Sequence, residues 1–354
     1  MSQTPDKTPM AVGRTFDWQK LLAPMVMVLL YIFFSIFGVN FFSVESLVNV
    51  LNASYFIGFM ALGVTFVIIT GGIDLSLGTT MICGMLIGGM AQNWGWSIWA
   101  SLALGVTVST LIGLLNGVMI AYLKLPPFIA TLGTQMMGMG FGAIITKVTT
   151  MRYTDQVFKR LFYKLGNEES LGILRGFPVG ILWLAAVFFI AWVVLNRTKF
   201  GRYTFAMGSN FEAARLSGIK TKYWLTLVYT LCGFFSGLAG IFFAAVYTTI
   251  IPSTGNGLEL LAIAGVVIGG TSMSGGTGSL TGTIIGVFTM SILRTGLMSM
   301  GLQGQWQTFM TGAVVIGAVL LDQYRVKRSN QVKKIWFPSV QNRWKNIKMG
   351  GTSP

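Results

Sequence analysis

The sequence predicts an all-α, polytopic membrane protein with about ten transmembrane helices in two related halves. Composition is the first observation behind this prediction: 53% of the 354 residues are hydrophobic and 10% are charged, whereas soluble domains carry about 25% charged residues. The second is the length of the apolar runs, several of which can cross a bilayer at about 1.5 Å per residue. The third is a glycine-rich string that occurs twice, as is typical of transporters made of two halves.

The first apolar run covers residues 21–42 and follows a polar N-terminal tail, residues 1–20. The run is longer than the apolar core of a signal peptide and begins later in the chain, and no small-residue cleavage site follows it. We therefore expect an uncleaved first span.

Nine further apolar segments follow. They cover residues 54–70, 77–91, 96–123, 127–147, 179–195, 223–247, 258–270, 279–299 and 305–321. Two of them, 77–91 and 258–270, are shorter than the ~17 residues of a simple span, and glycine-rich breaks flank them. We expect these two to be half-helices or to combine with neighbouring segments. The transmembrane domain thus covers residues 21–321.

Glycine spacing predicts where helices approach closely. Small residues four positions apart let membrane helices pack with short backbone separations. The chain contains four glycine pairs of this kind: Gly84/Gly88, Gly113/Gly117, Gly233/Gly237 and Gly282/Gly286.

The internal repeat has the pattern GGxxxSxG and occurs at Gly71–Gly78 and at Gly269–Gly276. An apolar run ends just before each copy. Two-halved transporters carry broken helices at corresponding positions, so we expect each copy to mark such a break; the alternative is a coincidence in a glycine-rich chain.

Basic residues indicate the orientation of the chain. With the N-terminus inside, ten spans place 18 of the 25 Lys and Arg residues on the cytoplasmic side and 6 on the outside, and Arg294 lies within a span. The positive-inside rule then predicts that both termini and the loop Gly208–Lys222 are cytoplasmic. The 6 outer residues, all between Lys147 and Arg175, conflict with this rule. The net charge of +15 is thereby assigned to membrane orientation, and no nucleic-acid partner is expected.

Several kinds of chemistry are disfavoured. The chain has no His, and its two cysteines, Cys83 and Cys232, lie in apolar runs. Serine and cysteine hydrolases usually need an imidazole base, a structural zinc needs four N or S ligands, and no GxxxxGK[ST] phosphate loop is present. We expect no catalytic residues, no metal site and no cofactor.

A polar island, Gly208–Lys222, stands between two long apolar runs. Ser209 and Asn210 are good helix N-caps, and Glu212 suits the positive end of a helix. A helix over residues 211–216 is expected to stop at Gly218. The island is either an ordinary loop between spans or a short helix that a soluble partner grips.

Five residues are candidates for a translocation path: Asp74, Ser76, Glu259, Ser274 and Arg294. A carboxylate at membrane depth is costly and normally faces protein, water or a substrate. Asp74 either lines the path or caps the helix that begins near Leu77, and Glu259 either lines the path or caps the segment beginning near Leu258. Arg294 either extends to the outer interface or binds a substrate hydroxyl.

Four strings resemble one family, the ABC-importer permeases of the ribose-type monosaccharide branch. Glu212-Ala213-Ala214 followed by Gly218 resembles the EAA loop of these permeases. ITGGIDLSLG, ending at Gly78, resembles a signature of the branch, as does LPPFIATLG at 125–133, although a plain helix start also explains its two prolines. ELLAIAGVVIGGTSMSGG at 259–276 departs from the familiar pattern: Leu261 replaces an acid and Gly265 an alanine. The resemblance covers residues 53–322.

The resemblance implies a permease subunit of an ATP-driven importer in a bacterial inner membrane, with a monosaccharide as substrate. It implies a cytoplasmic ATPase that grips the polar island, a periplasmic sugar-binding protein, and a second permease copy or paralogue. The ATPase-coupling residues would be Ser209, Asn210, Glu212, Ala213, Ala214 and Gly218. The alternative is an ion-coupled secondary transporter of a small polar solute. It accounts for the repeat and for Asp74 and Glu259, but gives no reason for the docking motif.

Two basic regions complete the expectations. Lys159, Arg160 and Lys164 lie in the outer loop and either dock the binding protein through opposite charge or form a solvated surface. The tail at 322–354 contains eight basic residues together with Trp336 and Trp344. It either lies on anionic lipid or is disordered.

Overall fold

The structure is a computed structural model, and it describes residues 19–165, 176–302 and 304–336. Within these ranges the chain forms 13 helices and one pair of two-residue strands. The helices are α1 (Gln19–Phe37), α2 (Val44–Ile69), α3 (Leu77–Asn93), α4 (Ile98–Ala121), α5 (Pro127–Thr146), α6 (Gln156–Phe162), α7 (Gly180–Arg197), α8 (Lys199–Ser209), α9 (Phe211–Leu216), α10 (Thr221–Tyr247), α11 (Leu258–Ile268), α12 (Leu280–Ser299) and α13 (Gly304–Trp336). The strands β1 (Met151–Arg152) and β2 (Thr249–Ile250) pair antiparallel.

The predicted all-helical membrane fold is confirmed, since each predicted apolar segment lies on a helix. In the described part of the chain, seven helices are long and apolar enough to cross a membrane. These are α2, α4, α5, α7, α10, α12 and the first 21 residues of α13. Residues 23–37 and α11 are shorter apolar helices, and α3 has 17 residues.

Some boundaries differ from the prediction. The first span ends at Phe37 rather than residue 42, because the chain turns at Asn40, whose φ is 52°. Helix α2 then begins at Val44, ten residues before the predicted start, with the Ser43 hydroxyl accepting from the Ser46 amide at 3.1 Å. The polar residues of this first turn hid the helix start. At the other end of the chain, α13 continues past residue 321 to Trp336, and residues 337–354 with Trp344 lie outside the described part.

Three elements were not predicted. Helix α6 lies within the basic outer loop, α8 precedes the polar island, and the β1–β2 pair joins residues almost 100 positions apart, Met151 opposite Ile250. Each is short and contains polar or half-buried residues, so none of them could be recognised as an apolar run.

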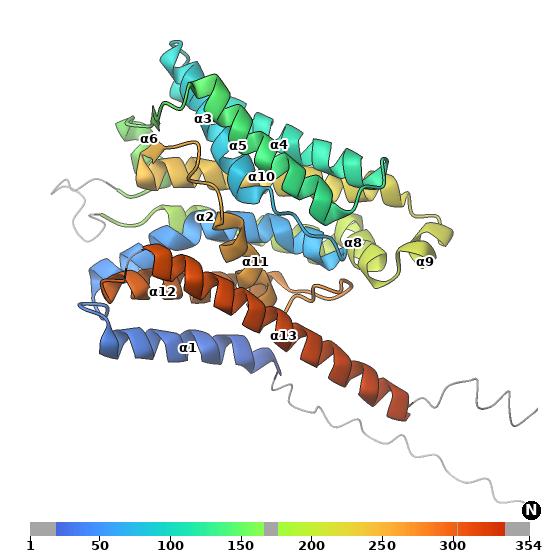
Figure 1. Cartoon of the computed structure of the whole chain (residues 1–354). Helices are drawn as coiled ribbons and strands as arrows, with labels where there is room; N and C mark the ends of the chain where they lie inside the picture. The colour runs from blue at the N-terminus through green and yellow to red at the C-terminus, as the bar shows by residue number, and fades with distance from the viewer. Residues whose placement is uncertain (1–18, 166–175, 303, 337–354) are drawn as a thin grey trace, which may run out of the picture.

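Helix α2 is the centre of the bundle. Every side chain from Asn52 to Ile69 is buried, because α7, α10, α11 and α12 pack around this helix. Helices α3, α4 and α5 form a layer on the far side of α10, while α1 lies against α12 and α13 against α11 (Figure 1). A helix that is buried on all sides is apolar around its whole circumference. The sequence of α2 therefore shows no amphipathic pattern.

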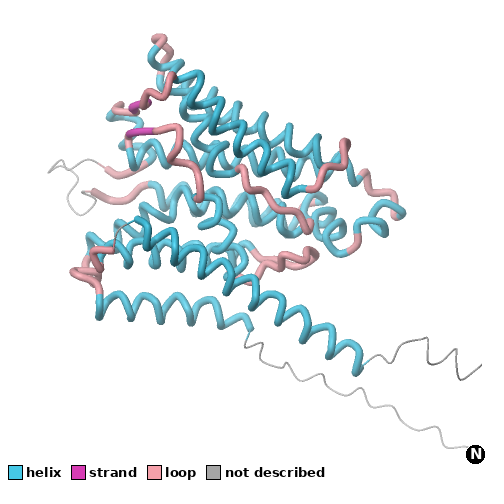
Figure 2. Tube along the Cα trace, viewed as in Figure 1, coloured by secondary structure: helices cyan, strands magenta, loops and turns pink. Residues whose placement is uncertain are grey.

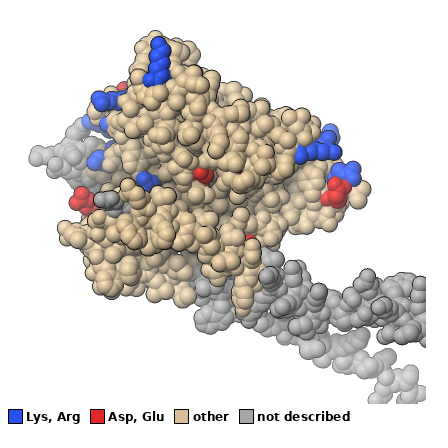
Figure 3. All heavy atoms as spheres, viewed as in Figure 1, with Lys and Arg blue, Asp and Glu red and all other residues tan. Residues whose placement is uncertain are grey.

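The two ends of the bundle differ. One end, here called the loop end, carries α8 and α9, and α1 begins and α13 ends there (Figure 1). The opposite end, here called the sheet end, carries α6 and the β1–β2 pair. Lys and Arg side chains gather at these two ends, while most of the visible face between them is uncharged (Figure 3). A broad uncharged belt is the surface that a lipid-embedded bundle presents.

The four predicted glycine pairs all lie at close helix contacts. A Cβ at Gly84 or Gly88 would lie 2.5 Å from a backbone oxygen of α4, and one at Gly113 or Gly117 would lie 2.8 Å from a Cα of α10. Gly233 and Gly237 face α4 from the other side of that contact. A Cβ at Gly282 or Gly286 would collide with the backbone of Gly269 or Gly265, respectively. Side chains larger than hydrogen would separate α3 from α4, α4 from α10, and α11 from α12.

Both copies of the repeat interrupt the helical structure, as expected. The first connects α2 to α3, and the second connects α11 to α12. Loop segments lead into α3 and α11 through the body of the bundle (Figure 2). The starts of these two helices lie close together, because a Cβ at Gly78 would collide with the Gly255 carbonyl oxygen and lie 2.7 Å from Glu259 Oε2. Thus α3 and α11 both begin away from the ends of the bundle.

Candidate functional site

The polar island folds as the sequence predicts. Helix α9 spans Phe211–Leu216, and the Asn210 side-chain oxygen caps it by accepting from the Ala213 amide at 2.9 Å. Gly218 follows the helix with φ 85°, a left-handed conformation that glycine adopts without steric cost. The capping role expected of Ser209 is wrong, because this residue ends α8 and only Asn210 caps α9.

The side chains of α9 divide between two directions. Ala214 is buried, whereas Glu212 forms an exposed ion pair with Arg215 at 2.7 Å. Leu216 is 79% exposed. One face of α9 therefore packs on the bundle and the other is presented outward.

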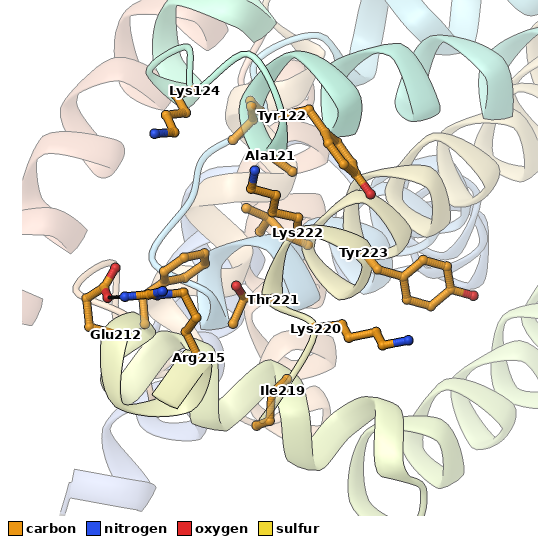
Figure 4. A pocket seen from close by; sticks show the side chains of 13 residues that line it. Ala121, Tyr122, Lys124, Glu212, Arg215, Ile219, Lys220, Thr221, Lys222 and Tyr223 are labelled. Atoms are coloured by element: carbon orange, nitrogen blue, oxygen red, sulfur yellow. Dashed lines mark hydrogen bonds and ion pairs between the residues drawn. The ribbon is translucent and has the colours of Figure 1, made fainter. Parts of the chain in front are cut away.

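A groove of about 890 Å³ lies beside α9, between the end of α4 and the start of α10 (Figure 4). Its polar lining is mainly basic, with Lys124, Arg215, Lys220 and Lys222 against a single carboxylate, that of Glu212. The Lys222 ammonium lies 5.6 Å from the centre of the Tyr122 ring. The groove thus offers cationic and aromatic groups at the loop end.

A glycine junction, formed by Gly71, Gly208, Gly275 and Gly276, joins the polar island to both copies of the repeat. The Gly276 amide donates to the Ile69 carbonyl at 2.8 Å. A Cβ at Gly208 would collide with that same carbonyl and lie 2.6 Å from the Gly276 nitrogen. A Cβ at Gly275 would lie 2.9 Å from the Gly71 nitrogen, and one at Gly276 would lie 3.1 Å from the Ser209 Cα.

The glycine junction leaves no space for a side chain at Gly208, Gly275 or Gly276, whereas a Cβ at Gly71 would make only an ordinary contact, 3.7 Å from the Ser274 carbonyl oxygen. The end of α8 is in van der Waals contact with the end of α2 and with the loop after α11. Protein interiors packed at this density transmit displacement rather than absorb it. The end of α8 therefore touches both breaks, and a displacement of α8 would press on them.

Asp322 was not predicted as a functional residue, and position 322 entered the sequence analysis only as a boundary. Its side chain is 7% exposed, and Oδ2 accepts from the Ser272 hydroxyl at 3.2 Å and the Met273 amide at 3.0 Å. It fastens α13 to the loop after α11. A lone aspartate at the end of an apolar run was the available signal.

Asp74 is buried at the start of α3, in a chain of hydrogen bonds. Its Oδ1 accepts from the amide and the hydroxyl of Ser76 at 2.9 and 2.6 Å, and the Ser76 hydroxyl accepts from Asn116 Nδ2 at 2.9 Å. The expected capping of the first helical turn is wrong in detail, because Asp74 bonds Ser76, the residue before the helix. The chain of bonds attaches the first break to α4.

Glu259 lies in the first turn of α11 and is 3% exposed. Its Oε1 accepts from Gln135 Nε2 at 2.8 Å and from the Gly257 amide at 3.1 Å. The second bond satisfies the amide that precedes α11, so the expected capping role holds. The first bond ties α11 to α5, which the sequence did not predict.

The remaining candidates do not gather with Asp74 and Glu259. Ser274 is exposed in the loop after α11, next to Gly71 of the glycine junction. Arg294 lies on α12 with its guanidinium 5.5 Å from the centre of the buried Phe56 ring. Lys159 and Arg160 lie on α6 at the sheet end, and Lys164 follows two residues after that helix with its ammonium 5.1 Å from the Tyr163 ring.

Two amide residues were missed although the sequence carried a signal for them. Asn116 and Gln135 are the Asn or Gln residues of α4 and α5, and polar side chains inside spans usually face protein or a functional path. Both contact the candidate carboxylates, Asn116 through Ser76 and Gln135 directly.

Residues 46–319 match the family described as "Branched-chain amino acid transport system / permease component". The ribose import permease protein RbsC of Bacillus subtilis (strain 168) is 37% identical over 316 residues, which cover 86% of this chain and 93% of the relative. The RbsC protein of Escherichia coli (strain K12) is 35% identical over 310 residues, covering 86% and 93%.

The fructose import permease protein FrcC of Rhizobium meliloti is 34% identical over 310 residues, covering 85% of this chain and 84% of the relative. No solved structure matches the chain. A permease component of an ABC importer does not itself hydrolyse ATP; it works with an ATPase and a substrate-binding protein. The family match and the helical bundle together place this chain in that class as a multi-pass membrane protein of a bacterial import system. The chain belongs to the permease family of binding-protein-dependent ABC import systems.

Proposed function

We propose that the chain carries a monosaccharide, ribose-like or fructose-like, across the membrane by converting a movement of the ATPase into a change of accessible side. The observation that carries this proposal is the glycine junction, because it connects the outward-facing helix α9 to both interrupted segments of the bundle. The sugar class is supported by the names of the relatives, which import ribose and fructose.

The ATPase grips α9 and the basic groove beside it. Asn210 and Ala214 hold the helix in place, while Glu212 and Leu216 are available to a partner. Ser209, Ala213 and Gly218 belong to the same coupling segment: Ser209 ends α8, the Ala213 amide donates to the Asn210 cap, and Gly218 follows α9. A partner surface with acidic groups matches the cationic lining of the groove.

The translocation path runs past the start of α3, where Asp74, Ser76 and Glu259 lie. Ser274, in the loop after α11, and Arg294, on α12 beside the Phe56 ring, complete the proposed path. A second copy of the chain or a paralogue packs along α5, which leaves most of its side chains exposed.

The loop end faces the cytoplasm of a bacterium, and the sheet end faces the periplasm. This orientation places both ends of the chain inside, because α1 begins and α13 ends at the loop end (Figure 1). It also places the basic groove on the side that the positive-inside rule favours.

Docking of the sugar-binding protein depends on the basic residues around α6. Replacing Lys159, Arg160 and Lys164 by Glu should weaken the binding of that protein by about tenfold or more, because charge complementarity governs such encounters. Affinity is measured on purified permease in nanodiscs at two salt concentrations, since screening weakens exposed charge pairs. As a control, Lys124, Lys220 and Lys222 at the loop end are replaced by Glu, which changes the net charge equally. Unchanged binding by the first variant would remove the docking surface from the account.

ATP-dependent uptake tests the function as a whole. The chain is reconstituted in proteoliposomes with its ATPase and binding protein, and uptake of radiolabelled D-ribose and D-fructose is measured. We expect uptake that requires ATP and the binding protein. Uptake driven by an ion gradient without the ATPase would instead support the ion-coupled alternative, which the family match disfavours.

A further inference from the structure

Three polar side chains meet where α3 and α11 begin. Gln135 extends from α5, Asn256 from the turns before α11, and Glu259 from α11 itself. Gln135 Nε2 donates to Glu259 Oε1 at 2.8 Å and lies 3.4 Å from Asn256 Oδ1. This polar cluster, Gln135, Asn256 and Glu259, is held by segments about 120 residues apart in the chain.

Glu259 has an acceptor that the folded chain does not use. Its Oε1 takes two hydrogen bonds, whereas Oε2 is buried and has no hydrogen-bond partner among the described residues. Leaving a buried charged acceptor unpaired is more costly than leaving a neutral one. Such an acceptor points to a partner that is present in another state of the protein.

The residue that covers this oxygen is Gly78, which has no side chain. Glu259 Oε2 lies 2.7 Å from the position that a Cβ of Gly78 would occupy, in the first turn of α3. On its other side the cluster is open, because Asn256 is exposed. A movement that separates α3 from α11 would uncover Oε2 beside two carboxamides, without breaking any hydrogen bond between α3 and Glu259.

We propose that the polar cluster is a subsite for the hydroxyl groups of a neutral polyhydroxyl solute in transit. Glu259 accepts hydrogen bonds from two hydroxyls, which can be on neighbouring carbons of the solute. Gln135 and Asn256 both donate and accept hydrogen bonds. The subsite forms when α3 and α11 separate, and α3 covers it in the state described here. The proposal rests on the proposed function, because it assigns the substrate contacts of that same path.

The donor set favours a polyol over a cation. A hard divalent cation takes six to eight oxygen ligands in the case of Ca²⁺ and prefers several carboxylates. The cluster offers one carboxylate and two carboxamides. Hydroxyl groups need donors and acceptors together, and the cluster supplies both.

Two substitutions test the subsite in the reconstituted importer. Glu259→Gln removes the charge at constant shape, and Asn256→Ala truncates an exposed side chain, so the second keeps the test valid if the first disturbs folding. Glu259→Gln should lower D-ribose uptake by about tenfold or more, and Asn256→Ala, which removes a neutral partner, by about threefold to tenfold. The matched controls are Glu45→Gln, in the exposed first turn of α2, and Asn196→Ala, at the exposed end of α7.

A second readout separates substrate contact from a structural role. The uptake of 2-, 3- and 5-deoxy-D-ribose is compared with that of D-ribose, with the same binding protein throughout. A subsite that reads hydroxyls discriminates strongly against analogues that lack them, so at least one discrimination ratio should fall toward unity in Glu259→Gln or Asn256→Ala and stay constant in the controls.

The results distinguish failure of the proposed function from failure of the subsite. If the unmodified importer takes up neither D-ribose nor D-fructose with ATP, the proposed function fails and the subsite with it. If it takes them up and both variants match the controls in rate and in every discrimination ratio, the proposed function stands and the subsite alone is wrong. A general loss of rate with unchanged ratios would also overturn the subsite, because the residues would then only support the fold.

Discussion

Replacing Gly208 by Val should lower ATP-driven sugar uptake by about tenfold to a hundredfold. A Cβ at this position would collide with the Ile69 carbonyl and lie 2.6 Å from the Gly276 nitrogen. Overpacking of this kind costs about 1–3 kcal/mol, and ~1.4 kcal/mol corresponds to a factor of ten. The strain falls on the contact between α8 and both breaks, so α8 must move away from them. ATP hydrolysis by the assembled complex should continue while sugar uptake falls.

Gly312→Val provides the comparison for this variant. Gly312 lies in α13, and a Cβ there would meet no atom within 4 Å, so uptake should stay near that of the unmodified protein. Uptake and ATP hydrolysis are measured on the same proteoliposomes. If Gly208→Val transported as well as Gly312→Val, the glycine junction would not be a route for the movement.

A double substitution on the coupling segment, Glu212→Lys with Gly218→Arg, should release the ATPase from the permease. Glu212 and Arg215 form an exposed ion pair, and such pairs contribute little to stability. Gly218 has φ 85° with open space around it, so a larger residue there costs about 1–2 kcal/mol of backbone strain. The fold should therefore survive, while a surface with two new cations and a distorted helix end no longer fits its partner. We expect ATPase co-purification to fall by about tenfold or more, with uptake falling alongside it.

The control for the double substitution uses the same residue types at the sheet end. Glu45 lies in the first turn of α2, and Gly95 has φ 90° with open space around it. Glu45→Lys with Gly95→Arg should leave ATPase co-purification unchanged. A comparable loss in both double variants would mean that the effect comes from altered charge or folding rather than from α9.

The fold was predictable where hydrophobicity alone sets the structure. The apolar runs located the spans, and the glycine pairs located three close helix contacts, because both depend on local composition. The start of α2 was missed because its first turn is polar, with Glu45 and Ser46. Helix α8 was missed because basic residues near spans suggest a loop, although this segment is amphipathic with Gly201, Thr204 and Met207 buried.

The candidate site was predictable only in part. Helix α9 and its cap follow from local rules, and Asn210 and Gly218 obey them. The contact of Gly208 with Ile69 and Gly276 depends on the packing of three distant segments, about which local sequence carries no information. The bond between Gln135 and Glu259 is of the same kind. An amide inside an apolar run indicates that it has a partner, but not which one.

The two ends of the bundle should contact different partners, the ATPase at α9 and the sugar-binding protein at α6. Single cysteines at Leu216 on α9 and at Lys159 on α6 carry a photoactivatable cross-linker, and the native thiols Cys83 and Cys232 are buried. The complex is irradiated in membranes, and the captured proteins are identified by mass spectrometry. We expect Leu216→Cys to capture the ATPase and Lys159→Cys to capture the sugar-binding protein. Capture of the ATPase from Lys159→Cys, or its absence from Leu216→Cys in an assembled complex, would contradict the account.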